Sequence, residues 1–364
     1  MMNRHKRPIM IMAGGTGGHV FPALAVANYL RDLGENIIWL GTRAGIEARV
    51  VPAAGIEIEW LSIHGVRGKS LLTKALAPFK ILQASWQALG IIRKHQPRAV
   101  LGMGGFVSGP GGLMAWLSRI PLFVHEQNAV PGLTNKWLSH VARINFFAFP
   151  SAASGIKRSR VVGNPVRQDI LSMEAPKQRY QPRQNSPINL LVIGGSLGAK
   201  SLNDALPAAI ARLPENVRPH IRHQTGKGKL EACEQLYREN GVQVEISEFI
   251  DDMKSAYEWA DLVICRAGAL TVAELAAAGV ASILVPYPYH VDDQQYHNAL
   301  FLVDADAAIV CRDEDFDSAF IVGKLQHFSQ HKAELLQMAE RARAIAYTQA
   351  SERVAQAILK EAQS

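Results

Sequence analysis

A glycine-rich stretch near the beginning of the chain has the composition of a phosphate-binding loop. It precedes His19 and consists of Gly14, Gly15, Thr16, Gly17 and Gly18. Glycines let backbone N–H groups approach an anion closely at a helix N-terminus, where the helix dipole also favours negative charge. We expect this loop to bind phosphate. The neighbouring His19 is placed to act either as a general base or as a local hydrogen-bond partner at the helix start.

A second glycine loop, at residues 194–198, also follows an apolar run and precedes a segment of helical period. Two units of strand, glycine loop and helix indicate two Rossmann-like domains, which bind ligands at the carboxyl ends of their strands. We therefore expect the substrate site in the cleft between the domains. The second loop also fits the G-x-S-x-G nucleophile motif, so a serine hydrolase using Ser196, Asp261 and His290 is an alternative function.

The sequence lacks the usual patterns for cofactors and metals. The first loop has neither the Gly-Lys-Ser/Thr of a P-loop nor the G-x-G-x-x-G of a dinucleotide site. The second expected strand is followed by no acid that would hold an NAD ribose. Two Asp-x-Asp pairs, at residues 304–306 and 315–317, lie away from any expected strand end. We expect no cofactor and no metal, so that a diphosphate leaving group would need a cation, for which Arg167 is the candidate.

Polar side chains also follow other expected strands. Residues 125–128 read His-Glu-Gln-Asn after an apolar run, which places a base, an acid and two amides at the carboxyl end of a strand. This location favours a functional role. Thr271 and Glu274 have the spacing of a helix capping box, which would account for the carboxylate without a ligand. Glu274 is equally suited to accept hydrogen bonds from a ribose.

The elements that position these residues alternate between short apolar runs and longer segments of helical period, as in parallel β-α-β folds. The first set of expected strands covers residues 8–13, 37–40, 99–102, 122–125 and 141–147. The second set covers residues 189–193, 221–224, 242–246, 262–265 and 282–285. Residues 174–187, rich in Gln, Arg and Pro, are expected to form a connecting segment without regular structure. Residues 333–362 have helical composition throughout.

The length of 364 residues and the hydrophobic content of 48% fit two packed domains of an α/β protein. We expect an N-terminal domain at residues 1–165, a C-terminal domain at residues 166–342, and a last helix at residues 343–364 that packs back on the first domain. No apolar run approaches the ~20 residues that span a bilayer. The start of the chain does not resemble a secretory signal, and three cysteines without CxxC spacing favour neither disulfides nor zinc. The cytosol is the expected compartment.

The charge of the chain is unevenly distributed. Residues 1–165 hold 19 Lys and Arg against 6 Asp and Glu, a net charge of +13, whereas residues 166–364 hold 20 against 26, a net charge of −6. No acid lies between Glu59 and Glu126. A basic surface favours an anionic partner, either a lipid leaflet or nucleic acid. A nucleic-acid-binding module is therefore a further alternative, although the sequence contains no motif of that kind.

Apolar residues recur at spacings of three and four within this acid-free stretch, and a helix is expected to begin near Pro78. Such a pattern is typical of a buried core face. Because lysines bracket the apolar residues and acids are absent, it also fits a patch that binds a membrane surface. The expected patch consists of Leu72, Leu76, Phe79 and Trp86 with Lys69, Lys74 and Lys80.

An ordered series of motifs resembles one bacterial family along essentially the whole chain. The motifs are GGTGGHVFP at residues 14–22, GMGGFVSGPGG at 102–112, HEQN at 125–128, GNPVR at 163–167, EFI at 248–250, GALT at 268–271 and QQ at 294–295. They are similar to those of the UDP-N-acetylglucosamine–N-acetylmuramyl-(pentapeptide) pyrophosphoryl-undecaprenol N-acetylglucosamine transferase family. The resemblance implies the GT-B fold, in which two Rossmann-like domains with parallel sheets face an interdomain cleft.

The resemblance implies a glycosyltransferase of peptidoglycan synthesis. The reaction would be an inverting, metal-independent transfer of N-acetylglucosamine from UDP-GlcNAc to the C4 hydroxyl of undecaprenyl-pyrophosphoryl-N-acetylmuramyl-pentapeptide, which converts lipid I to lipid II. The expected partners are these two substrates, an anionic membrane surface and other cell-wall synthesis proteins, with no nucleic acid. The expected location is peripheral, on the cytoplasmic face of the inner membrane.

The resemblance also implies the roles of individual residues. Ile250 would lie beside the uracil, Glu274 would hold the ribose, and Ser196 and Arg167 would bind the diphosphate. The other implied UDP-GlcNAc contacts are Thr16, Gly17, Gly18, Asn128, Ala269, Leu270, Thr271, Val272, Ala273 and Gln295. Contacts to the acceptor or the sugar are expected from Gly14, Gly15, Gly104, Gly105 and Gln294. The base that deprotonates the acceptor is either His19 or Glu126.

Overall fold

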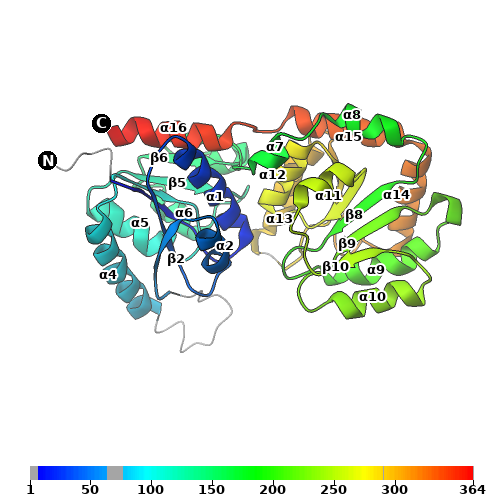
Figure 1. The fold of residues 1–364 in the computed structure, drawn as a ribbon, viewed down its shortest axis with the longest axis horizontal. Coiled ribbons are helices and arrows are strands. Elements are labelled where there is room, and N and C mark those ends of the chain that lie inside the picture. Colours follow the sequence, from blue (N-terminus) through cyan, green and yellow to red (C-terminus); the bar gives the residue numbers. More distant parts are fainter. Residues whose placement is uncertain (1–6, 64–76, 290, 364) are drawn as a thin grey trace. The chain divides into compact units, whose positions relative to one another are not determined.

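The computed structural model describes residues 7–63, 77–289 and 291–363, and the chain divides into two compact units. The first unit comprises residues 1–167 and 347–364, and the second comprises residues 168–346. Each unit has its own parallel sheet covered by helices, and each has its own buried core (Figure 1). Two parallel-sheet, Rossmann-like units confirm the α/β fold class expected from the sequence.

The first unit contains, among the described residues, a seven-stranded parallel sheet in the order β3-β2-β1-β4-β5-β6-β7. Its strands are β1 (Ile9–Met12), β2 (Ile37–Gly41), β3 (Glu57–Trp60), β4 (Ala99–Gly102), β5 (Leu122–Glu126), β6 (Ile144–Phe147) and β7 (Ser159–Val161). Its helices are α1 (Gly17–Asp32), α2 (Glu47–Ala53), α4 (Ala77–His95), α5 (Ser108–Leu117), α6 (Leu133–Leu138), η2 (Pro150–Ala153) and α16 (Ala350–Gln363). The strand order reverses between β1 and β4, which is where such sheets bind ligands.

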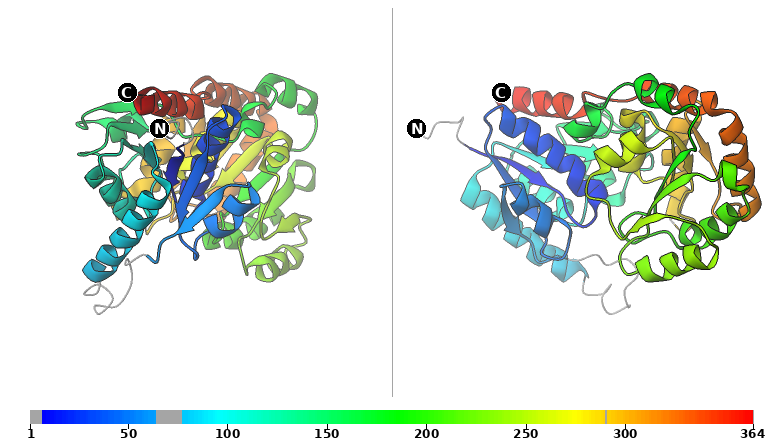
Figure 2. Two further views of the ribbon diagram at one scale, coloured as in Figure 1. Left: turned by 60° about the vertical axis from the view of Figure 1, so that its left-hand side comes forward. Right: turned by 45° about the vertical axis from the view of Figure 1, so that its right-hand side comes forward.

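The central strand β1 is buried on both faces, because helices cover both sides of the sheet. Successive side chains of a strand point to opposite faces. Ile9 and Ile11 belong to a core cluster that includes residues of α1 and α16, whereas Met10 and Met12 belong to a cluster that includes residues of α4. The last helix of the chain, α16, runs alongside α1 within this unit (Figure 2).

The second unit contains, within the described part of the chain, a six-stranded parallel sheet in the order β10-β9-β8-β11-β12-β13. Its strands are β8 (Asn189–Ile193), β9 (His220–Gln224), β10 (Glu245–Ser247), β11 (Leu262–Cys265), β12 (Ala281–Leu284) and β13 (Ala308–Val310). Its helices are α7 (Gln168–Leu171), α8 (Pro176–Tyr180), η3 (Gln181–Arg183), α9 (Lys200–Ala211), η4 (Glu215–Val217), α10 (Leu230–Glu239), α11 (Met253–Trp259), α12 (Ala269–Ala278), η5 (Val291–Asp293), α13 (Gln294–Val303), α14 (Ser318–Gln330) and α15 (Lys332–Ala344). The strand order of this second sheet reverses between β8 and β11.

Apart from β9, the inner strands coincide closely with apolar runs in the sequence, and the strands that were not predicted are edge strands. The sequence analysis missed β3, β7 and β13, each of which is the last strand on its side of a sheet. Edge strands are only three or four residues long here and partly exposed, so they lack a continuous apolar run. The expected strand at residues 242–246 is replaced by the shorter edge strand β10.

One expectation about helices was wrong, and the helical tail of the chain divides into two helices. Residues 174–187 were expected to lack regular structure, but they include α8, whose first residue is Pro176, a position that proline tolerates because the N–H is not needed there. Residues 333–362 are not one continuous helix, because the chain leaves the helical conformation between α15 and α16. The two helices belong to different units.

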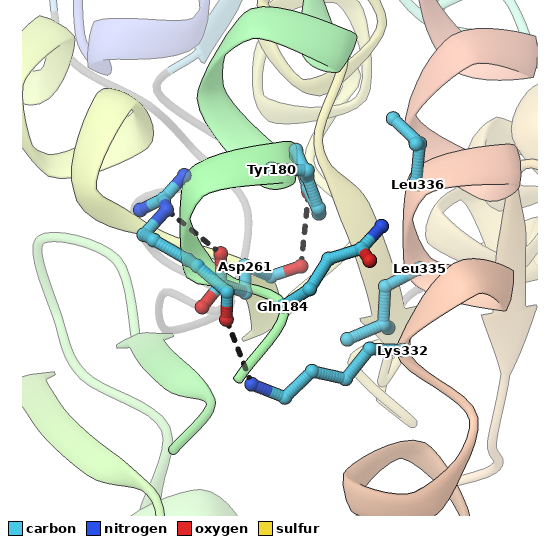
Figure 3. A pocket seen from close by; sticks show the side chains of 7 residues that line it. Tyr180, Gln184, Asp261, Lys332, Leu335 and Leu336 are labelled. Atoms are coloured by element: carbon cyan, nitrogen blue, oxygen red, sulfur yellow. Dashed lines mark hydrogen bonds and ion pairs between the residues drawn. The ribbon is translucent and has the colours of Figure 1, made fainter. Parts of the chain in front are cut away.

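A buried polar network attaches the segment around α8 to the rest of the second unit. Tyr180 Oη donates to the Asp261 carbonyl over 2.9 Å, and Arg183 Nε lies 3.3 Å from Asp261 Oδ1. Lys332 Nζ donates to the Arg183 carbonyl over 3.0 Å (Figure 3). Burial raises the pKa of the Asp261 carboxyl despite these cations. The small pocket drawn in Figure 3 therefore lies within a structural junction at the amino end of β11.

Candidate active site

In the first unit, three of the sequence motifs meet at one edge of the sheet. Residues 14–18 follow β1, residues 104–105 follow β4, and residues 126–128 end and follow β5, and these three strands are neighbours. The loops also touch. A Cβ atom built on Gly105 would lie 2.3 Å from the Gly14 carbonyl oxygen, so only glycine fits there, where φ is also +80°. The fold thus assembles the phosphate loop, His19 and the HEQN motif in one place.

The His19 ring is half-buried beside the phosphate loop and makes one hydrogen bond to a side chain from another strand end. Its Nδ1 atom lies 3.0 Å from Gln127 Oε1. Gly104 backs the ring so closely that a Cβ there would lie 2.6 Å from the same Nδ1 atom. His19 is therefore held by tertiary contacts rather than by hydrogen bonds at the helix start.

Glu126 is almost completely buried, and its carboxylate accepts four hydrogen bonds. Its Oε1 accepts from the Asn128 backbone N–H at 2.9 Å and from Asn128 Nδ2 at 3.2 Å. Its Oε2 accepts from the Gly132 N–H at 3.0 Å and from Asn135 Nδ2 at 2.9 Å. Because both oxygens are occupied by donors, the side chain has little capacity to take a proton from a substrate. The geometry favours a role for Glu126 in shaping the loop that carries Asn128.

A residue that the sequence analysis did not single out, Glu47, holds the phosphate loop from behind. Its carboxylate has no exposed surface. It accepts hydrogen bonds from Gly15 N at 2.9 Å, Thr42 N at 2.9 Å and Thr42 Oγ1 at 2.7 Å. Gly45 leaves the room for it, since a Cβ there would lie 2.0 Å from Glu47 Oε2. Because Gly15 N–H is used internally, the exposed residues Thr16 and Gly18 are better placed to meet a ligand.

Arg167 lies in the first unit, close to the start of α1. Its guanidinium carbon is 6.0 Å from the centre of the Phe21 ring. Phe21 in turn lies against Gly17 of the phosphate loop, where a Cβ would be 2.9 Å from the ring. The cation is thus near the first glycine loop.

The second glycine loop, like the first, is held by a buried polar side chain, which here comes from the neighbouring strand β9. Gln224, at the end of β9, accepts from Gly195 N at 3.1 Å and donates to the Gly195 carbonyl at 3.0 Å. The amide nitrogen also donates to the Glu248 carbonyl at 2.9 Å, which ties the loop after β10 to the same point. Ser196 is exposed at the tip of the loop, and Ile250 is half-buried just after β10.

Glu274 is not a helix-capping residue, so the capping explanation of this carboxylate was wrong. Helix α12 begins at Ala269 with Gly268 as its N-cap, which puts Thr271 and Glu274 inside the helix. Glu274 is only 8% exposed and accepts a hydrogen bond from Tyr257 Oη at 3.2 Å. A nearly buried carboxylate in the helix that follows β11 needs another explanation, and ligand binding supplies one.

The other residues of the second unit that are expected to contact UDP-GlcNAc also follow strands of its sheet. Ala269 and Val272 are buried, Val272 completely, so the α12 side chains with partly accessible surface are Leu270, Thr271 and Ala273. Gln295 lies in the first turn of α13, after β12, and its Oε1 accepts from the backbone N–H of Tyr287 at 2.9 Å. Gln294 precedes it at the first position of the same helix.

The serine hydrolase alternative is wrong on geometry. Ser196 follows the carboxyl end of β8, whereas Asp261 precedes β11 at the opposite edge of the same parallel sheet. There Asp261 Oδ2 accepts from the Asn189 backbone N–H at 2.9 Å, at the start of β8. The third proposed residue, His290, lies outside the described residues. Ser196 and Asp261 cannot belong to one triad.

Two clusters of potential metal ligands occur among the described residues. They are His327, His331 and Glu334, and Glu57, Glu59 and His95. Hydrogen-bonded ion pairs account for both, with His327 Nε2 2.7 Å from Glu334 Oε2 and His95 Nε2 2.7 Å from Glu59 Oε1. Neither cluster follows the carboxyl end of a strand, so neither contributes to the candidate site.

Three adjacent helices of the first unit expose apolar side chains. Helix α4 begins at Ala77, next to Pro78 as expected, and its Phe79 and Trp86 are 72% and 66% exposed. The buried-core interpretation of these two residues was therefore wrong. Lys80 is exposed as well, while Leu72, Leu76, Lys69 and Lys74 lie outside the described residues. Leu82, which belongs to the same apolar periodicity, is exposed too. The sequence analysis missed further exposed apolar residues on α4, α5 and α6, namely Ile81, Leu113, Trp116, Leu117, Leu133 and Trp137.

Comparison with known proteins supports one family. Residues 9–146 match the glycosyltransferase family 28 N-terminal domain, and residues 189–358 match the glycosyltransferase family 28 C-terminal domain. A relative from Alkalilimnicola ehrlichii, a UDP-N-acetylglucosamine–N-acetylmuramyl-(pentapeptide) pyrophosphoryl-undecaprenol N-acetylglucosamine transferase, is 50% identical over 98% of this chain and 99% of its own length. A relative of the same name from Methylococcus capsulatus is 49% identical over 98% of this chain and 99% of its own length.

Solved structures agree with these relatives. The crystal structure of Acinetobacter baumannii MurG is similar with a TM-score of 0.81 and 41% identity, over 97% of this chain and 99% of that one. Neisseria meningitidis UDP-GlcNAc 2-epimerase shares the fold alone, with a TM-score of 0.67 and 14% identity over 97% of this chain and 99% of that one. With both domains matched and near-full-length relatives at about half identity, the chain belongs to the UDP-N-acetylglucosamine–N-acetylmuramyl-(pentapeptide) pyrophosphoryl-undecaprenol N-acetylglucosamine transferase family, with the GT-B fold of glycosyltransferases.

Proposed function

We propose that this protein transfers N-acetylglucosamine from UDP-GlcNAc to the lipid-linked N-acetylmuramyl-pentapeptide, forming lipid II from lipid I. The observation that carries the proposal is the near-full-length identity of about 50% to relatives whose names describe this reaction. The site supports it, because in each unit a glycine loop follows the strand at which the strand order reverses. Phosphate-binding Rossmann-like folds have the same arrangement. The serine hydrolase and nucleic-acid-binding alternatives have no comparable support.

The second unit is suited to hold the nucleotide sugar. The carboxylate of Glu274, nearly buried and oriented by Tyr257, can accept hydrogen bonds from the ribose hydroxyls. Ile250 offers an apolar contact for the uracil, and the loop around Ser196 faces solvent with backbone N–H groups that suit a diphosphate. Leu270, Thr271 and Gln295 are left to contact the sugar.

His19 is the better candidate for the base in the first unit. An inverting transfer occurs in one displacement, in which the acceptor C4 oxygen bonds to the sugar C1 while the bond from C1 to the diphosphate oxygen breaks. A base must take the hydroxyl proton as this happens. His19 has a ring edge directed away from its Gln127 contact, whereas Glu126 already accepts four hydrogen bonds. The assignment favours His19 as base and Glu126 as the support of Asn128.

The departing UDP needs its growing charge stabilised. Loop N–H groups and the guanidinium of Arg167 are suited to do this without a metal ion. Under this proposal, addition of EDTA leaves turnover unchanged, and replacing Arg167 by alanine lowers it by about 10²-fold, as removal of one charge-stabilising group usually does. Loss of activity in EDTA that magnesium restores would contradict the metal-independent mechanism.

The direct test of the reaction uses the purified protein with UDP-GlcNAc and a lipid-linked muramyl-pentapeptide. We expect UDP release that depends on the acceptor, together with a product heavier by one N-acetylhexosamine. The same assay with UDP-glucose serves as the donor control. UDP release that does not require the acceptor, or the absence of a disaccharide product, would refute the proposed function.

The exposed apolar residues of α4, α5 and α6 support a peripheral attachment to an anionic membrane, where the lipid-linked acceptor resides. Trp86, Trp116 and Trp137 are large, amphipathic side chains of the kind that insert at a membrane interface. Lys80 and Lys136 are exposed on the same helices and add attraction to anionic headgroups, at about 1 kcal/mol per cation near the surface. No described helix is both long enough and apolar enough to cross a bilayer.

Vesicle binding tests this attachment. Replacing Trp86 and Trp137 with serine is expected to weaken binding to vesicles containing anionic lipid, while activity on a short-chain, water-soluble acceptor stays near wild type. Leu33 is the exposed apolar C-cap residue that follows α1, and Leu33→Ser is the matched control that leaves vesicle binding unchanged. Wild-type protein that binds neutral and anionic vesicles equally, or neither, would exclude the proposed membrane surface.

A further inference from the structure

A buried histidine, His125, determines the direction of a chain of hydrogen bonds that ends at His19. His125 has no exposed surface, and its Nε2 atom lies 3.0 Å from the Gly163 carbonyl oxygen. A carbonyl oxygen can only accept, so His125 Nε2 carries a hydrogen. Burial lowers the pKa of His125 to about 4, so the ring is neutral at neutral pH. His125 Nδ1 is therefore an acceptor.

The amide of Gln127 can then have only one orientation. Its Nε2 group lies 3.2 Å from His125 Nδ1 and 3.2 Å from the His125 carbonyl oxygen, and both of these atoms are acceptors. The NH₂ group must face them, which turns Oε1 toward His19 Nδ1 at 3.0 Å. Since an amide oxygen accepts only, His19 Nδ1 must carry a hydrogen. In the neutral His19 ring, Nε2 then has the free electron pair.

We propose that Gln127 is a positioning residue that fixes His19 in the Nδ1–H tautomer, so that Nε2 is the atom that takes the proton from the acceptor hydroxyl. This inference rests on the proposed role of His19 as the base. When Nε2 gains that proton, Nδ1–H continues to donate to Gln127 Oε1, so the amide needs no rearrangement and stabilises the imidazolium. The electron pair of the C1–oxygen bond leaves with UDP, and no other reagent is required.

The surroundings of His19 contain few other groups that could set its protonation. Gly104 covers the ring on the Nδ1 side and brings no charge. The Glu126 carboxylate is turned toward Asn128, Gly132 and Asn135. Among the described residues, His125 is the titratable group that faces His19 through the Gln127 amide, and it is neutral. Gln127, which is only 1% exposed, is thus the group that decides which nitrogen of His19 is protonated.

Nitrogen NMR of protein labelled with ¹⁵N-histidine measures the tautomer directly and without catalysis. In the wild type we expect His19 to show a protonated Nδ1 and an unprotonated Nε2. In Gln127→Leu, which keeps the approximate volume but none of the three side-chain hydrogen bonds, we expect His19 to lose this preference and the turnover number to fall by about 10²-fold. UDP affinity, measured by calorimetry, should stay within twofold of wild type.

Gln127→Glu provides a second variant that keeps the site polar. A carboxylate accepts from His19 Nδ1–H and favours the charged form of that ring, so the acidic limb of the pH dependence of kcat/KM should move to higher pH by about one unit. Asn145→Leu is the matched control, because Asn145 is a buried amide of the same unit that donates only to backbone carbonyls of residues 139 and 157. It should leave the His19 tautomer and the pH profile unchanged.

The outcomes separate this inference from the function on which it rests. If His19 keeps the Nδ1–H tautomer in Gln127→Leu, or if Gln127→Glu leaves the pH profile in place, Gln127 does not position His19. If the tautomer changes while turnover does not, Gln127 still controls the ring but His19 is not the base. A changed tautomer together with lowered turnover supports both.

Discussion

Replacing Glu47 with glutamine is expected to destabilise the first unit through its phosphate loop. The buried carboxylate accepts from Gly15 N, Thr42 N and Thr42 Oγ1. A carboxamide has a single oxygen, so whichever way it turns, its NH₂ group faces one of the two backbone N–H groups. A buried donor left without an acceptor costs about 1–3 kcal/mol, and bonds to a charged acceptor are the stronger kind. We expect the free energy of unfolding of the first unit to fall by about 2–4 kcal/mol.

Amide hydrogen exchange in increasing urea measures this change and locates it. The exchange of either Gly15 N–H or Thr42 N–H should accelerate most in Glu47→Gln, because one of these two amides loses its acceptor, and the amides of β1 should report the loss of global stability. Glu57 is an exposed carboxylate of the same unit, and Glu57→Gln should change stability by no more than about 0.5 kcal/mol. If Glu47→Gln behaves like this control, or if the exchange of both Gly15 and Thr42 is unchanged, the carboxylate does not hold the loop.

Three further predictions concern the site. Glu274→Gln should weaken UDP binding at least tenfold by calorimetry, whereas Tyr257→Phe, which removes only the orienting hydroxyl, should weaken it less; equal affinities in wild type and Glu274→Gln would exclude contact with the ribose. His19→Ala should lower turnover by about 10²- to 10⁴-fold, and Glu126→Gln should mainly lower thermal stability. The reverse pattern would make Glu126 the base. Since burial lowers the pKa of His125 to about 4 from 6.5, the unfolded state binds more protons between these values. Stability should therefore fall by about 1.4 kcal/mol per pH unit as the pH drops through this range, and His125→Gln should flatten the dependence in urea titrations at several pH values.

The sequence by itself determined the architecture and the positions of the two glycine loops at the ends of inner strands. Inner strands of a parallel sheet are buried on both faces, so they appear as unbroken apolar runs such as Ile9–Met12, and they can be recognised locally. The glycine loops after β1 and β8 are also local signals, because the close approach of backbone to backbone or to phosphate requires glycine. Edge strands such as β7 carry no such signal, since their exposed faces accept polar residues.

Tertiary structure alone decided which polar residues support the site. Glu47 and Gly15 are 32 residues apart, and His19 and Gln127 are 108 residues apart, so no local pattern links the partners of either pair. The same holds for Glu274, whose spacing to Thr271 suggests a capping box until the observed start of α12 excludes it. Hydrogen bonds between side chains of different strand ends depend on strand order. The sequence shows that such residues follow strands, but only the folded sheet determines which of them meet.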